Sequence, residues 1–313
     1  MVYFTVSRLY KAVIDNVEGY LVEVVYALTF HRDSILPPFT SRTMRSVMFK
    51  SPCLRGVADL YSSTRSIKPV TIRVLRSSSG PLYKLKKGGR ELKPYMVKSG
   101  DTLYGAISFY KRNFDEQIYD ALSCSGAVDI EYAKLHLEVV EANVYSMENL
   151  SLGIESSFRI DFITPLIITT KTMTPPSIRN TRVGKVIKKS KQAYRLFPTP
   201  GYILSQAMRQ WLSIVHGIDP NNSWYPYSIG RLGDLLMVEV DYNVNPVTAL
   251  YGRSSKGLIL VRGFRGYTIY TILNRIITGA VDRLLAFSSI IGLGKSRSIG
   301  FGEIRVRPVE WRV

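Results

Sequence analysis

The sequence predicts an α+β protein made of two tandem halves, each with the element order βαββαβ of a ferredoxin-like domain. Strand-like runs rich in β-branched and aromatic residues recur in each half, a helical stretch follows the first run of each, and a glycine-rich segment precedes the last run. We expect a first domain over residues 1–154, in which 1–19 look like an extension, and a second over 155–313. A length of 313 residues suits two domains.

The elements of the first half follow from local patterns of hydrophobicity and turn residues. Strands are assigned where β-branched and aromatic residues cluster or alternate, and the helix start is assigned to a Thr or Ser that follows the Pro37-Pro38 turn. In order, we expect a strand at 20–30, a helix from Thr40 or Ser41 to about Lys50, a strand at 68–76, a hairpin region marked by 77–80 and 88–89, a helix at 114–122 and a strand at 133–144.

The second half repeats this order after a basic, proline-containing loop. Thr199 followed by Pro200 is a favourable pair for the cap and first turn of a helix, and an apolar stripe continues from there. We expect a strand at 158–168, the loop at 171–198, a helix from Thr199 to about Val215, strands at 235–243 and 257–270, a helix at about 270–287 and a strand from Glu303.

The charge of the chain is large and unevenly distributed. Lys and Arg number 42 against 24 Asp and Glu, a formal charge of +18. Residues 65–98 hold ten basic residues and one acid, and residues 171–195 hold eight basic residues and no acid, whereas 112–161 hold ten acids and three bases. Clustered positive charge is relieved by a polyanion, so nucleic acid is the leading partner and an anionic membrane surface the second.

The cysteine spacing and the hydropathy of the chain indicate the cellular compartment of the protein. Cys53 and Cys124 lack C-x-x-C spacing, so we expect neither a zinc site nor a disulfide scaffold, which fits a reducing compartment. Arg8 and Lys11 interrupt the start of the chain before a signal sequence develops, and charged residues interrupt the apolar stretch 271–294. We therefore expect a cytoplasmic protein without a membrane span.

The most informative segment is GLGKSRSIGFG at residues 292–302. Its glycines permit positive φ angles and let backbone N–H groups lie along a phosphodiester, and its bases add cationic donors. The segment differs from a P-loop, because its strand comes after the loop, and from the dinucleotide motif in glycine spacing. We assign RNA binding to Gly292, Gly294, Lys295, Ser296, Arg297, Ser298, Gly300 and Gly302.

This segment resembles the C-terminal G-loop of the RAMP superfamily, whose domains are RRM-like. Across nearly the whole chain beyond Tyr20, the nearest likeness is to the CRISPR repeat-processing endoribonucleases, the sixth Cas family, in their crenarchaeal form. The matching segments are ILPPFTSRTMRSVM, FITPLIITTKTMTPPS, NVNPVTALYG and VRGFRGYTIY.

The resemblance implies RNA cleavage that needs no metal or other cofactor. A ribose 2′-hydroxyl attacks the adjacent phosphorus and leaves a 2′,3′-cyclic phosphate and a 5′-hydroxyl, which requires a base, cations and an acid. The implied partner is CRISPR repeat RNA and its crRNA product, with no membrane partner. A homodimer and association with an interference complex are left open.

Residue by residue, the family pattern falls on Arg45, Lys68 and Arg262. Arg45 is then expected to orient or stabilise the scissile phosphate, Lys68 to act as acid or electrostatic partner, and Arg262 to bind the phosphorane. Arg42 and Lys50 are reserve candidates, and Tyr61 can donate a proton but matches no motif.

Many family members use a histidine in or just after the first helix, and this chain departs from that pattern. His31 precedes Pro37 at the end of the first strand, so it is kept only as a reserve catalytic candidate. His136 and His216 are expected to be structural. The crenarchaeal branch lacks the histidine and relies on Lys and Arg.

The basic segment 171–195 is expected to bind the RNA backbone. Its assigned residues are Arg179, Arg182, Lys185, Lys188, Lys189 and Lys191. Two other functions remain open: a non-catalytic RAMP subunit that holds crRNA in an interference complex, and a basic scaffold or membrane-surface protein without RNA chemistry.

Overall fold

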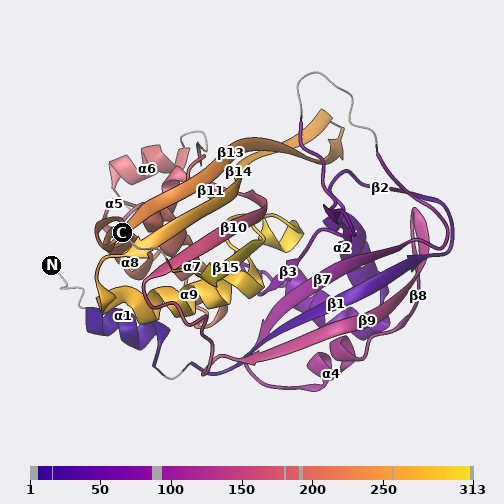
Figure 1. Cartoon of the computed structure of the whole chain (residues 1–313), viewed down its shortest axis with the longest axis horizontal. Coiled ribbons are helices and arrows are strands. Elements are labelled where there is room, and N and C mark those ends of the chain that lie inside the picture. The colour runs from indigo at the N-terminus through magenta and orange to yellow at the C-terminus, as the bar shows by residue number, and fades with distance from the viewer. Residues whose placement is uncertain are drawn as a thin grey trace.

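The computed structural model describes residues 6–15, 17–86, 94–179, 181–189, 193–255 and 257–310. Figure 1 shows two α+β lobes side by side, the first holding most of the N-terminal half and the second the C-terminal half. None of the helices in these ranges is long and apolar enough to cross a bilayer.

The first lobe is built on an antiparallel sheet with the order β5-β4-β7-β1-β9-β8, to which β3 adds by pairing with β7. The order β3-β7-β1-β9 is that of a ferredoxin-like core, the predicted fold class, although no strand was predicted at β7. The strands are β1 (Tyr20–Phe30), β3 (Val70–Ile72), β4 (Arg76–Ser77), β5 (Gly80–Pro81), β7 (Thr102–Lys111), β8 (Gly126–Ile130) and β9 (Ala133–Ser146). A separate pair joins β2 (Ser34–Leu36) to β6 (Tyr95–Val97).

Helices pack on this sheet through their apolar sides. They are α2 (Ser41–Lys50), the 3-10 turn η1 (Pro52–Leu54), α3 (Arg55–Ser62) and α4 (Glu116–Leu122). Met44, Val47 and Met48 of α2 are fully buried in one cluster with the sheet residues. The predicted first helix is confirmed, whereas α3 was not predicted, and the predicted strand 68–76 is regular only over β3.

The second lobe repeats the topology with the sheet order β13-β14-β10-β15. Its strands are β10 (Ser157–Leu166), β13 (Met237–Ser254), β14 (Gly257–Ile272) and β15 (Ile304–Pro308), and its main helices are α7 (Pro200–Ile214), α8 (Tyr225–Leu236) and α9 (Thr278–Ile291). Trp211 of α7 and Phe287 of α9 pack edge to face at 5.2 Å in the core. The tandem ferredoxin-like fold class is thus confirmed.

Two predictions for the second half were wrong in detail. The expected loop 171–198 contains η2 (Thr170–Met173), α5 (Pro176–Arg179), α6 (Arg182–Lys189) and β12 (Tyr194–Arg195), which pairs with β11 (Ile168–Thr169). The last helix starts later than expected, because Tyr270 is fully buried on β14 between Phe158 and Glu239. Asn274 then caps the short turn η3 (Arg275–Ile277) that leads into α9.

The N-terminal extension forms helix α1 (Val6–Val13), which packs on α9 of the second lobe. Leu9 and Val13 are fully buried in the core cluster of that lobe. In Figure 1, α1 lies beneath α9, on the side of the second lobe. Packing onto α9 explains why this segment carries apolar residues at helical spacing.

The expectation of unpaired cysteines was wrong. Cys53, in η1, and Cys124, which follows α4, form a disulfide with a Cα–Cα distance of 5.4 Å. Their spacing of 71 residues carries no local motif, so only the packing of η1 against α4 brings them together.

Reduction of this disulfide is expected to lower the free energy of unfolding by about 2–4 kcal/mol, because the bridge restricts a long loop of the unfolded chain. The measurement is thermal unfolding with and without reductant, with Cys53→Ser as the variant that reductant should no longer affect. Equal melting temperatures of the untreated and reduced wild type, together with titratable thiols in the untreated protein, would contradict this bridge.

The two lobes meet through an apolar cluster and a strand hairpin. Phe39 and Phe301 stack with ring centroids 4.2 Å apart, in a buried cluster that also holds Val74, Tyr83, Ile167 and Ala249. The β13–β14 hairpin reaches the first lobe (Figure 1), where the Lys86 amide donates to the Thr248 carbonyl at 2.8 Å. The glycine-rich loop lies at this junction.

Candidate active site at the lobe junction

The glycine-rich loop, residues 292–302, joins α9 to β15 and packs closely against the protein. Its glycines are buried and have positive φ angles, namely Gly292 at 78°, Gly294 at 87°, Gly300 at 98° and Gly302 at 69°. A Cβ atom at Gly302 would collide with the carbonyl oxygen of Leu293. Internal packing therefore requires glycine at these positions, and RNA contact through their backbone N–H groups stays a prediction.

Arg297 is also reassigned, because its side chain is buried, with the residue 3% exposed. Its guanidinium donates to Thr71 Oγ1 at 2.6 Å and to the carbonyl oxygens of Lys68 and Ile291. Burial lowers the pKa of Arg297 to about 9, so the group is still charged at neutral pH. Arg297 thus ties the loop to the start of β3 and is not available to RNA.

The loop offers solvent the side chains of Lys295 and Ser296, and part of Ser298. The Ser298 side chain lies close enough to the Tyr61 hydroxyl of α3 to lower the pKa of that hydroxyl. Ser41 Oγ at the start of α2 donates to the carbonyl of Ile299 at 2.6 Å. The exposed part of the loop therefore lies against α2 and α3, which carry the predicted catalytic residues.

Tyr61 stands at the centre of this junction. Burial raises the pKa of the Tyr61 hydroxyl, while the positive charge of Arg45 opposes that shift and Tyr251 reinforces it. The guanidinium carbon of Arg45 lies 5.4 Å from the Tyr61 ring centroid and 5.7 Å from that of Phe49. A phenol keeps its proton at neutral pH, and the charge of Arg45, which favours loss of that proton and opposes the effect of burial, makes Tyr61 a candidate proton donor.

Arg42, a reserve candidate, lies on the same side of α2. Its guanidinium carbon is 5.8 Å from the ring centroid of Tyr251 on β13. A Cβ atom at Gly252 would lie 2.5 Å from Arg42 Nη1, so glycine makes room for this guanidinium. The structure therefore brings together Arg42, Arg45, Tyr61 and Ser298.

Lys68 and Arg262 lie outside this group of contacts. Lys68 Nζ donates to the carbonyl of Ser63 beyond the end of α3, and its own carbonyl accepts from Arg297. Arg262 is exposed on β14 opposite Thr248. Among the described residues, no hydrogen bond or ion pair joins Arg262 to Tyr61 or Ser298.

The remaining reserve candidates are placed less favourably. The His31 side chain is exposed, and its backbone bonds to Lys134 and to Ser99 Oγ, which belong to neither the loop nor α2 and α3. Lys50 is exposed at the last residue of α2. Neither of these bonds joins His31 to the glycine-rich loop, α2 or α3, so its catalytic role as a reserve candidate gains no support from the structure.

The basic segment presents cations on α6. Arg182, Lys185 and Lys189 are exposed there, while Gly184 and Ile187 line a pocket. For Arg179 and Lys188 only the backbone is described, and Lys191 lies outside the described residues. Helix α6 thus presents a basic face beside that pocket.

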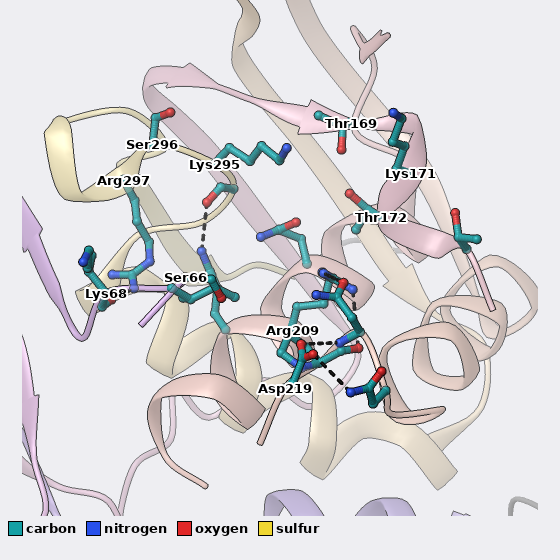
Figure 2. Close-up of a pocket in the computed structure, with 18 of the residues that line it drawn as sticks. Ser66, Lys68, Thr169, Lys171, Thr172, Arg209, Asp219, Lys295, Ser296 and Arg297 are labelled. Atoms are coloured by element: carbon teal, nitrogen blue, oxygen red, sulfur yellow. Dashed lines mark hydrogen bonds between the residues drawn. The ribbon is translucent and has the colours of Figure 1, made fainter. Parts of the chain in front are cut away.

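This pocket, the junction pocket, has a volume of about 680 Å³ and adjoins the glycine-rich loop. Lys68, Lys171, Arg209, Lys295 and Ser298 are among the residues that line it, and Figure 2 shows Lys295 extending toward Thr169 and Lys171. Burial lowers the pKa of Lys295, and the charges of Arg209 and Lys171 lower it further. An anion between these cations would offset their repulsion.

Sequence reasoning missed Tyr61 as a central residue and did not assign Arg209 or the two glutamines of the pocket. Gln206 and Gln210 are four residues apart on α7 and share one helix face. Polar residues at that spacing on an otherwise apolar helix are the signal that could have identified this wall. For Tyr61 the sequence holds no comparable signal, because Ser298, which lies near it in the fold, comes 237 residues later in the chain.

Two family models match the chain, one in each lobe of the fold. The family model "Cas6 N-terminal domain" matches residues 22–145, and the model "CRISPR-associated endoribonuclease Cas6" matches residues 160–304. Two curated proteins of Saccharolobus solfataricus, named CRISPR-associated endoribonuclease Cas6 2 and Cas6 1, are 25% and 24% identical over 280 and 285 residues. In each case the match spans 88% of this chain and 92% of the relative.

Solved structures show the same architecture. A Cas6 product complex superposes with a TM-score of 0.60 at 15% identity, covering 92% of this chain and 99% of the other. A Thermus thermophilus Cas6 structure gives a TM-score of 0.55 at 16% identity, with 92% and 98% covered. At this identity the likeness concerns the fold.

Proposed function

Since this chain belongs to the Cas6 family, whose two models together match most of its length, we propose that it is an endoribonuclease that cleaves CRISPR repeat RNA to crRNA. The curated relatives are named as endoribonucleases, and the positive charge of +18 suits an RNA partner. We place this activity in the cytoplasm because its proposed substrate is a cellular transcript; the Cys53–Cys124 disulfide removes the argument for a reducing compartment that the cysteine spacing had provided.

The observation that carries the proposal is the placement of Tyr61 beside Arg45, whose guanidinium carbon lies 5.4 Å from the Tyr61 ring centroid, and close to Ser298 of the glycine-rich loop. Cleavage by an internal 2′-hydroxyl needs a proton for the leaving 5′-oxygen and positive charge for the phosphorane. We assign Tyr61 to donate that proton and Arg45 to stabilise the developing negative charge. Ser298 lowers the pKa of the Tyr61 hydroxyl, which favours proton donation, and Arg42 is assigned to a neighbouring phosphate.

The other predicted residues support binding in this proposal. Lys68 and Lys295 line the junction pocket, where they attract the phosphodiester backbone. Arg262, exposed on the hairpin, is assigned to phosphate contact away from the Tyr61 group. Arg182, Lys185 and Lys189 extend the basic surface along α6.

Incubation of a labelled repeat RNA with the protein in EDTA tests the proposal. We expect one cleavage site, with a 2′,3′-cyclic phosphate on the upstream product and a 5′-hydroxyl on the downstream product. A substrate with a 2′-deoxynucleotide at the cleavage site should bind and stay intact, because the attacking hydroxyl is gone. Tight, salt-dependent binding without any product from the all-ribose RNA would refute cleavage and favour a non-catalytic crRNA-binding subunit.

A further inference from the structure

The junction pocket contains chemistry that the cleavage step does not use. It lies between η2, α6, α7 and the glycine-rich loop (Figure 2). Its volume of about 680 Å³ falls within the roughly 300–1,000 Å³ typical of small-ligand pockets. Asp219 is the only carboxylate among the described residues that line it, and its oxygens bond to the amide groups of Asn221 and Asn222.

One side of the pocket is suited to a phosphate group. Lys171, Arg209 and Lys295 are close enough that the first two lower the pKa of the third, after the larger effect of burial. Arg209 is held in place by Asn221 Oδ1 at 2.7 Å. An anion that contacts all three cations would reduce the repulsion between them.

A second side of the pocket offers amide groups. Gln210 is 1% exposed; its Nε2 donates to the Gly294 carbonyl at 3.0 Å, while its Oε1 is buried without a partner among the described residues. Gln206 is 6% exposed and lines the pocket one helical turn earlier. An unsatisfied buried amide costs about 1–3 kcal/mol, which a ligand with donor and acceptor groups would offset.

The pocket also adjoins the proposed cleavage site. Ser298 lines the pocket and lies close enough to the Tyr61 hydroxyl to lower its pKa. Ser66 and Lys68, which follow α3, line the same wall. A strand whose scissile phosphate lies at Tyr61 therefore passes close to the mouth of the pocket.

We propose that the junction pocket takes one unpaired nucleotide next to the scissile phosphate. Its phosphate lies among Lys171, Arg209 and Lys295, and its base edge bonds to the amide of Gln206. Side-chain amides present a donor and an acceptor side by side, the pattern with which unpaired bases are read. The inference rests on the proposed function, since it takes the RNA to be cleaved at Tyr61.

Binding to RNAs with a single abasic nucleotide tests the base contact. The RNAs carry 2′-deoxyribose at the cleavage site, so they bind without reacting, and the abasic position moves along the residues on both sides of that site. We expect one position at which base removal raises the Kd about 10- to 100-fold, as loss of a specific base contact does. In Gln206→Leu, the same base removal should change the Kd little, while Gln117→Leu, an amide outside this pocket, should respond like the wild type.

The phosphate contact has its own test. Lys295→Ala should weaken binding of every RNA and lower the slope of log K against log salt by about one, whereas Lys134→Ala, an exposed cation on β9, should leave it as in the wild type. A wild type insensitive to base removal at every flanking position, or a Gln206→Leu variant as sensitive as the wild type, would overturn the proposal. So would tight binding of a free nucleoside monophosphate, which would assign the pocket to a small ligand.

The experiments distinguish a wrong proposal for the pocket from a wrong proposal for the cleavage function. If all-ribose RNA is not cleaved, but base removal raises the Kd of the wild type and not that of Gln206→Leu, the cleavage function is refuted and the pocket proposal stands. If cleavage occurs with no dependence on a flanking base, the pocket is refuted and the cleavage function stands.

Discussion

Replacing Tyr61 by phenylalanine is expected to slow repeat RNA cleavage by at least about 10²-fold, because a positioned general acid contributes 10²- to 10⁴-fold. RNA binding should persist, since the phenyl ring still packs beside Arg45 and only the hydroxyl near Ser298 is removed. Single-turnover cleavage with excess enzyme measures the effect, and a filter-binding Kd measured with 2′-deoxy RNA shows that binding is retained.

The role of Tyr61 as proton donor has a specific signature. In an RNA with sulfur in place of the leaving 5′-oxygen, the leaving thiolate needs no proton, so Tyr61→Phe should cleave it nearly as fast as the wild type does. Tyr110→Phe is the matched control, because burial also raises the pKa of Tyr110 but its hydroxyl bonds to the Glu18 carbonyl. A Tyr61→Phe variant with near wild-type rates on ordinary RNA would exclude this residue as the acid.

Replacing Arg297 by methionine is expected to lower the free energy of unfolding by about 2–4 kcal/mol, because buried carbonyl groups lose their donor. Those carbonyls belong to Lys68 and Ile291, so the change also loosens the loop from β3 and slows cleavage. Thermal or urea unfolding measures the loss. The salt dependence of RNA binding should keep its slope, since Arg297 is buried and meets no phosphate.

Lys295→Met provides the matched control for Arg297, two residues away in the same loop. Lys295 is exposed on the loop, although its ammonium group is partly buried in the junction pocket, so the stability should change little while RNA binding weakens and its salt slope falls. If Arg297→Met were as stable as the wild type but lost RNA affinity like Lys295→Met, the assignment from the sequence would be right and the structural role wrong.

Elements with strong local signals were predicted well from the sequence. β1 begins and ends where its run of β-branched and aromatic residues does, and α7 begins at Pro200 after Thr199, as the cap pattern indicates. β7 and α8 were missed, because a strand buried along most of its length gives little alternation and a helix next to a strand blurs the boundary between them. The family resemblance, stated from the glycine-rich loop and its companion segments, is confirmed by the family models.

By itself, the sequence determined the tandem βαββαβ order, the excess of positive charge and the family. These are recorded in periodicity, composition and contiguous motifs, which need no partner elsewhere in the chain. Only the tertiary structure decided that Arg297 is buried, that Cys53 pairs with Cys124, and that Tyr61 meets Ser298. Each depends on two segments far apart in the chain that packing brings together, and the local chemistry of either segment does not specify its partner.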